Sequence, residues 1–109
     1  MLRGVVVGVR TLPLPRLVAG RDYADDMVST LGKVVGQDVV VDATKLLSGT
    51  TSFAYQLIER LLAEEHANSV LLVGAPADFA EYATHAAREL HVTDRFDLAE
   101  ELPRTAAAG

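Results

Sequence analysis

The chain has 109 residues, which is enough for one domain with one hydrophobic core. Half of its residues are hydrophobic but only three Tyr and three Phe are aromatic, so we expect a core built mainly from Val, Leu, Ile and Ala. The formal charge of −5 argues against a surface that binds nucleic acid or an anionic membrane, because both need clustered basic side chains.

Cysteine is absent, which excludes a disulfide framework and a thiolate metal site and fits a reducing compartment. The longest apolar run in the first ten residues is Val5–Val7, too short for the core of a signal peptide or for a membrane span. The sequence therefore predicts a cytoplasmic protein.

The amino-terminal third begins with a predicted buried strand at Val5–Val9. Pro13 and Pro15 follow, and two closely spaced prolines favour an edge strand or an extended connector. A helix is predicted over Arg16–Leu31, with Gly32 placed to end it. Its apolar side chains share one helical face: Tyr23, Ala24, Met27, Val28 and Leu31.

The middle of the chain holds a strand, a turn and a helix. Val39–Val41 is a continuous β-branched run, typical of a strand that is covered on both faces in a parallel sheet. Ser48–Ser52 is a short polar turn, and the clearest helix of the chain follows it over Phe53–Leu62. The stripe that this helix should bury is Phe53, Ala54, Leu57, Ile58, Leu61 and Leu62.

The last third predicts a buried strand at Ser69–Gly74 and a helix whose inner face runs from Phe79 to Leu90, with Pro76 and Asp78 at its start. Phe96 is expected to close the sheet. Residues 97–102 are expected to form a short final helix. We expect a single domain that spans residues 1–103, followed by a flexible tail of residues 104–109. Strands that alternate with helices indicate an α/β fold with a mostly parallel sheet.

Ligands and partners of such sheets meet the loops that follow the strands. Asp42–Thr44, Ser48–Ser52 and Gly74–Pro76 should converge there. Four of the five residues of the Ser48–Ser52 turn carry a hydroxyl, directly before a helix whose first amides are unpaired. One interpretation is that Thr51 or Ser52 caps the helix and the others fill the turn; another is that a hydroxyl is modified or that the turn holds a phosphate. Asp42 has two open interpretations, a loop-capping residue and a functional acid.

The segment Val39-Val40-Val41-Asp42-Ala43-Thr44-Lys45-Leu46-Leu47, the hydroxyl-rich turn, the helix after it and Val70–Gly74 together resemble the core of a STAS domain, the fold of anti-anti-sigma factors. In that family an Asp-Ser-Ser-Gly turn opens the helix, and its first serine is the phosphoacceptor, which corresponds here to Thr51. The sequence departs from the motif at Thr50 and Phe53. Ser52-Phe53-Ala54 is closer to a STAS-like branch whose motif runs Ser-Phe-Ala.

The resemblance implies a four- to five-stranded mixed sheet with helices packed mainly on one face. It also implies a non-catalytic regulatory module that binds a protein partner, an anti-sigma-type kinase or a related ATPase, under control of phosphorylation at Thr51 or Ser52. No cofactor is expected. The residues expected to meet the partner are Asp42, Ser48, Gly49, Thr50, Thr51, Ser52 and Tyr55.

Other functions remain open at this stage. The same polar turn would suit a protein that binds a small ligand or a nucleotide, and a hydrolase, a transferase or a structural subunit are further alternatives. No glycine-rich phosphate loop and no placed acid–base pair is present. His66, His85 and His91 lack the spacing of metal ligands, so we expect them to be surface or structural residues and expect no bound metal.

Overall fold

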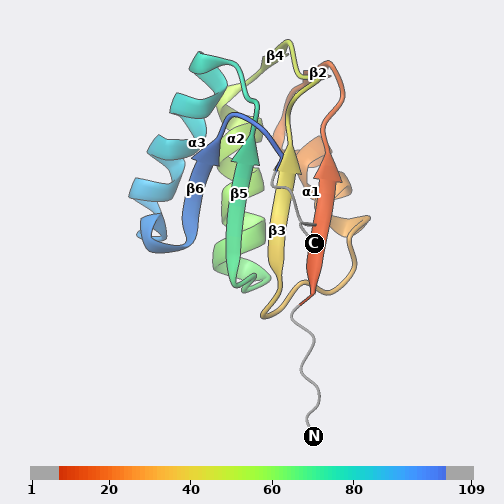
Figure 1. Ribbon diagram of the computed structural model, residues 1–109, viewed down its shortest axis with the longest axis vertical. Coiled ribbons are helices and arrows are strands. Elements are labelled where there is room, and N and C mark those ends of the chain that lie inside the picture. Colours follow the sequence, from red (N-terminus) through yellow and green to blue (C-terminus); the bar gives the residue numbers. More distant parts are fainter. Residues whose placement is uncertain (1–7, 103–109) are drawn as a thin grey trace, which may run out of the picture.

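The computed structural model describes residues 8–102 and shows an α/β fold around a four-stranded sheet in the order β1-β3-β5-β6 (Figure 1). The strands are β1 (Val9–Pro13), β3 (Asp38–Asp42), β5 (Ser69–Val73) and β6 (Phe96–Ala99). The predicted α/β class is confirmed. The resemblance implied a mixed sheet, whereas every pairing among the described strands is parallel.

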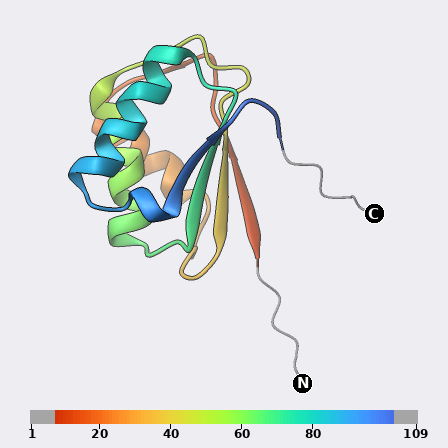
Figure 2. The ribbon, with the colours of Figure 1, turned by 60° about the vertical axis from the view of Figure 1, so that its left-hand side comes forward.

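Three helices lie on the same face of the sheet, as expected (Figures 1 and 2). They are α1 (Arg21–Ser29), α2 (Thr51–Ile58) and α3 (Ala77–Glu89). α2 continues without a break into a π-helical segment, η1 (Glu59–Glu64), and a short 3-10 turn, η2 (Thr93–Arg95), leads into β6. No helix in residues 8–102 has the length and apolar character needed to cross a membrane.

A second, two-stranded sheet lies beyond the carboxyl ends of the main strands (Figure 1). It pairs β2 (Leu17–Val18) in parallel with β4 (Ser48–Gly49). Two predictions are wrong here: the first helix begins at Arg21 rather than Arg16, and two of the five residues of the predicted Ser48–Ser52 turn, Ser48 and Gly49, form a strand. The reason is tertiary pairing, since the two short segments satisfy each other's backbone groups although they lie far apart in sequence.

The predictions for both edges of the main sheet also need correction. The first strand begins at Val9 and extends to Pro13 at the edge of the sheet, where a residue without an amide hydrogen is tolerated; Val5–Val7 lies outside the described residues. The final helix predicted for residues 97–102 is wrong, because Phe96–Ala99 pairs with β5 as the strand β6. The tail predicted for residues 104–109 lies outside the described residues.

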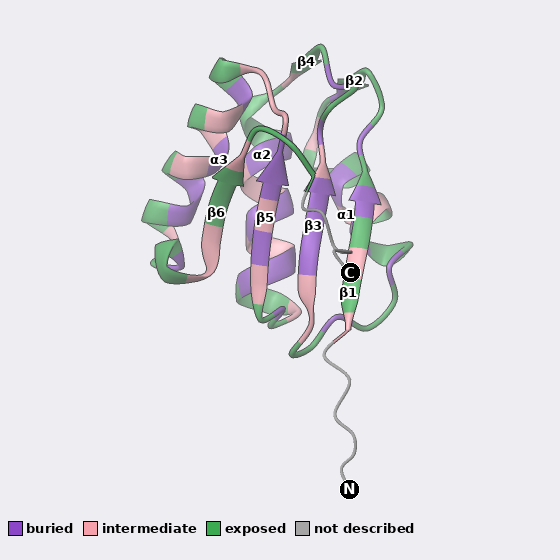
Figure 3. Ribbon diagram, in the orientation of Figure 1, coloured by how far each residue is buried: buried purple, intermediate pink, exposed green. Residues whose placement is uncertain are grey.

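The hydrophobic core fills the space between the helices and the inward face of the sheet (Figure 3). The stripe predicted for the second helix is entirely buried. The Phe53 ring of α2 packs against the Phe79 ring of α3, with 6.2 Å between their centroids. α1 is tied to α2 by Asp25, whose carboxylate accepts hydrogen bonds from Gln56 at 2.8 Å and Arg60 at 2.9 Å. These contacts fix where the start of α2 lies relative to α1 and α3.

Candidate functional site

The cap of α2 is Thr50, one residue earlier than expected. Thr50 has extended backbone angles, and its Oγ1 accepts a hydrogen bond from the Phe53 amide at 3.2 Å. The same oxygen accepts a second bond from the Gly20 amide, also at 3.2 Å, which ties the start of α2 to the start of α1. The interpretation that Thr51 or Ser52 caps the helix is therefore wrong, because both residues already lie inside it.

Thr51 and Ser52 are the first two residues of α2, and both are exposed. The Ser52 hydroxyl lies 3.3 Å from the Thr50 hydroxyl. Within residues 8–102, no hydrogen bond of the Thr51 hydroxyl is formed to another residue. Since Thr50 already serves as the cap, the Thr51 side chain is not needed to start the helix.

Gly49 places this helix start close to α3. A Cβ atom at Gly49 would lie 2.5 Å from Phe79 Cδ1 and 2.9 Å from Val18 Cγ2, well inside van der Waals contact. Only glycine allows β4 to approach Phe79 this closely. Gly49 is thus a packing residue that positions Thr50 and Thr51.

Asp42 ends β3 and closes the loop that follows. Its Oδ1 accepts hydrogen bonds from the Thr44 hydroxyl at 2.6 Å and from the Thr44 amide at 3.0 Å. These two bonds, together with the nearby charge of Lys45, lower the pKa of Asp42 below its usual value. The geometry is that of a loop-capping side chain.

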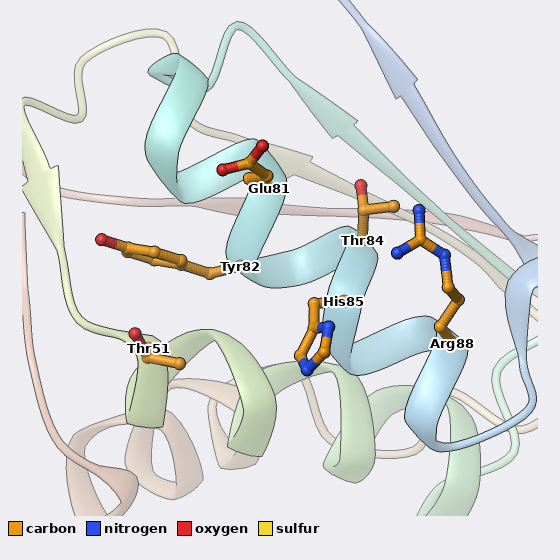
Figure 4. A pocket seen from close by; sticks show the side chains of 6 residues that line it. All are labelled: Thr51, Glu81, Tyr82, Thr84, His85 and Arg88. Atoms are coloured by element: carbon orange, nitrogen blue, oxygen red, sulfur yellow. The ribbon is translucent and has the colours of Figure 1, made fainter.

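Two adjoining surface hollows, of about 650 and 490 Å³, lie beside the start of α2. Thr51 and His85 line both of them. The larger hollow is completed by Arg21, Ser52, Tyr55, Glu59 and Glu89, and the smaller by Glu81, Tyr82, Thr84 and Arg88 (Figure 4). Of the residues predicted to meet a partner, Thr51, Ser52 and Tyr55 are brought together here, whereas Asp42, Ser48, Gly49 and Thr50 line neither hollow.

Sequence reasoning missed the contribution of α3 to this site. The His85 ring is directed from α3 toward α2 (Figure 4), and its Nε2 lies 3.0 Å from a Glu89 carboxylate oxygen. The spacing of four residues between His85 and Glu89 was the signal that could have revealed the pair. On the other side, the Arg21 guanidinium lies 5.8 Å from the centre of the Tyr55 ring, a cation–π distance.

Thr51, His85 and Glu89 bring a hydroxyl, an imidazole and a carboxylate to one hollow. They do not form an activated nucleophile as they stand. The Nε2 atom of His85 contacts Glu89, no hydrogen bond joins His85 to Thr51 in the described residues, and the His85 side chain is 62% exposed. A nucleophile needs the base within hydrogen-bond reach and a third group that orients it.

The other histidines have backbone roles. His66 and His91 directly follow Glu65 and Leu90, the C-cap residues of η1 and α3, and both have positive φ angles, 56° and 60°. A left-handed residue at this position is a common way to end a helix. Among residues 8–102, no group of three or more His, Cys, Asp or Glu side chains is placed to hold a metal ion.

Comparison of the chain with protein-family models, curated proteins and solved structures gives no match. The resemblance to STAS domains thus depends on the sequence alone. What the structure adds is an exposed Thr51 hydroxyl beside two hollows, with residues of α1, α2 and α3 around it.

Proposed function

We propose that the protein is a non-catalytic regulatory module that binds a protein partner at the start of α2, with the Thr51 hydroxyl as its control point. One observation carries this proposal. Thr50 provides the helix cap, so the exposed Thr51 hydroxyl is not needed to start the helix and can be modified or covered without loss of folding stability.

The physical effect of a phosphate at Thr51 differs between the free and the bound protein. It would add about −1.5 to −2 charges at the first residue of α2. The helix start favours an anion by about 0.3 to 1 kcal/mol, so the free domain tolerates the group. An interface shaped for a neutral hydroxyl would have to desolvate that charge, which costs several kcal/mol. Phosphorylation would therefore release the partner and leave the fold intact.

The surroundings of Thr51 suit a partner with mixed chemistry. Tyr55 offers an aromatic face, Arg21 a cation, and Glu59 and Glu89 carboxylates, all around the larger hollow. Aromatic and arginine side chains are enriched at the energetic centres of interfaces. The resemblance to anti-anti-sigma factors supports an anti-sigma-type kinase or a related ATPase as the partner.

Affinity purification from the native host tests this proposal, with the wild-type chain, Thr51→Ala and Thr51→Glu as parallel baits. We expect one partner to be enriched by wild type and Thr51→Ala and to be lost with Thr51→Glu. Ser29→Glu is the matched control, because Ser29 carries an exposed hydroxyl at the carboxyl end of α1. A partner retained equally by all four baits would remove Thr51 from the mechanism.

The larger hollow supports a second candidate function, the binding of a small anionic ligand or a nucleotide. Its volume of about 650 Å³ lies within the range of small-molecule sites, and Arg21 and His85 are placed on its rim. A thermal-shift panel of nucleotides and inorganic phosphate tests this candidate, because a bound ligand raises the melting temperature. A shift that disappears in Arg21→Ala would support it, and the absence of any shift at millimolar ligand would reject it.

A further inference from the structure

The main sheet has two edge strands, β1 and β6, and β1 presents a row of outward backbone groups (Figure 1). The Asp38 amide donates to the Gly8 oxygen at 3.1 Å, so the backbone groups of Gly8 point toward β3. Backbone groups point alternately to the two sides of a strand, so those of Val9, Thr11 and Pro13 point away from β3. Within the described part of the chain, neither the Val9 amide nor the Thr11 amide donates a hydrogen bond.

The opposite edge is blocked by a side chain of its own strand. On β6 the Leu98 amide, which points away from β5, donates to the Asp97 carboxylate at 2.8 Å. Charged side chains on an edge strand hinder the pairing of a further strand. The one charged side chain of β1, Arg10, is directed elsewhere, because it donates to the backbone oxygens of Leu31 and Lys33. The β1 edge therefore lacks the protection that β6 has.

The side chains that accompany these outward backbone groups are uncharged and exposed. The Val9 side chain is 62% exposed, and Thr11 and Pro13 are exposed as well. An edge strand with unpaired amides and without charges is a template for pairing with a strand of another chain. A strand that pairs here would be held by main-chain hydrogen bonds, as in β-strand addition.

We propose that β1 pairs with β1 of a second copy of the chain, antiparallel, about a two-fold axis at Thr11, so that the two main sheets become continuous. In this register the two Thr11 residues exchange both of their backbone hydrogen bonds, and each Val9 amide donates to the Pro13 oxygen of the other copy. Pro13 has no amide hydrogen, and this register needs only its oxygen as an acceptor. Every outward amide of both strands is thereby used.

Cross-strand neighbours favour this register over the adjacent ones. A Thr–Thr pair at the axis is a favourable cross-strand pair, and Val9 lies opposite Pro13 on the same face. An axis at Arg10 would place two like charges directly opposite each other, which is destabilising. An axis at Leu12 would leave the Thr11 oxygen facing Pro13, which has no hydrogen to donate. The β1 strand is therefore complementary to itself in one register.

The length of β1 sets the strength of this dimer. Five residues at about 3.3 Å each give an edge of roughly 16 Å. Pairing along it buries much less than the roughly 800 Å² per partner of a stable interface. The net charge of −5 on each copy also opposes association. We therefore expect a reversible dimer with a dissociation constant in the high micromolar range.

Single cysteines test the proposal, because the chain has none of its own and any disulfide then joins two copies. Across the axis, the two Cα atoms of Thr11 should lie about 5.5 Å apart, a distance that a disulfide spans. Those of Val9 should lie roughly 14 Å apart, which is too far. At high micromolar concentration, mild oxidation should cross-link Thr11→Cys at least tenfold faster than Val9→Cys. Leu98→Cys, an exposed position on the opposite edge, is the matched control and should cross-link as slowly as Val9→Cys.

A mixture of two variants tests the register. Val9→Cys and Pro13→Cys should cross-link at least tenfold faster together than either does alone, because the two positions lie opposite each other only in the antiparallel pair. Amide hydrogen exchange of the unmodified chain is the second readout. The Val9 and Thr11 amides should exchange about threefold more slowly at about 1 mM than at about 10 μM protein, through mass action on the dimer, whereas the Leu98 amide should not change.

Three results would overturn the proposal. The first is cross-linking of Thr11→Cys no faster than that of Val9→Cys. The second is rapid exchange of the Val9 and Thr11 amides at every concentration, which would leave the edge unpaired. The third is slow exchange that does not depend on concentration, which would show that another part of the same chain covers β1.

Discussion

Gly49→Ala is the substitution that tests most sharply how the start of α2 is positioned. The new methyl group would lie 2.5 and 2.6 Å from two carbons of the Phe79 ring. Phe79 is fully buried and packs against Phe53, so its ring cannot move aside without disturbing the core. Overpacking of this kind costs about 1 to 3 kcal/mol of unfolding free energy. In a domain of this size such a loss lowers the melting temperature by roughly 5 to 20 °C.

Chemical denaturation of Gly49→Ala and of Ser48→Ala measures this cost. Ser48 is the exposed neighbour in the same strand, and its substitution should change the unfolding free energy by no more than about 0.5 kcal/mol. If the clash with Phe79 is the cause, Gly49→Ala should cost at least about 0.5 kcal/mol less in a Phe79→Leu background. A Gly49→Ala protein as stable as wild type, or a cost that is the same in both backgrounds, would refute the close approach of β4 to α3.

Two further predictions concern hydrogen bonds of the described residues. Thr50→Ala should lower the unfolding free energy by about 1 kcal/mol through loss of the helix cap, whereas Thr51→Ala should change it by less than about 0.5 kcal/mol. Denaturant titration measures both changes. A larger loss for Thr51→Ala than for Thr50→Ala would show that Thr51, and not Thr50, is the cap. Hydrogen bonds from Asn68 and Ser69 hold the pKa of Asp38 in the folded protein below its unfolded value of 3.8. The Asp38 carboxylate therefore stabilises the fold at pH values above 3.8, and this stabilisation is lost as the pH falls through the lower folded pKa. Melting temperatures measured from pH 6 to pH 2 should therefore decline less steeply for Asp38→Asn than for wild type, and identical slopes would contradict this assignment.

The parts of the fold that the sequence predicted are those with a strong periodic signal. The buried stripe of the Phe53–Leu62 helix follows from its spacing alone, and Val39–Val41 lies centrally because a continuous β-branched run suits a central parallel strand. The short strands β2 and β4 carry no such signal. Each has two residues and exists only through pairing with a segment some thirty residues away.

The last segment shows how tertiary pairing overrides local preference. Residues 97–102 contain helix-forming Leu, Ala and Glu, which favoured a helix. Without β6, the backbone groups along the outer edge of β5 would be unpaired, and Phe96–Ala99 pairs with them instead. The periodicity of a sequence does not show whether a segment will pair with the edge strand of a sheet.

The sequence placed the candidate site at the start of α2 but did not reveal all the residues that surround that helix start. The position of the cap was missed because Thr50, Thr51 and Ser52 are all good capping residues, and the sequence does not show that the Thr50 hydroxyl accepts the Phe53 and Gly20 amides. The contribution of His85 depends on how α3 packs beside α2, which no local pattern encodes.

The most direct test of the proposed function is the affinity of the purified partner for wild type, Thr51→Ala and Thr51→Glu, measured by isothermal titration calorimetry. We expect Thr51→Glu to bind at least tenfold more weakly than wild type, a loss of about 1.4 kcal/mol, with its melting temperature nearly unchanged. Thr51→Ala should bind within about threefold of wild type, because the interface is shaped for a neutral side chain. Equal affinity of all three proteins would contradict the account and leave Thr51 as an ordinary first residue of α2.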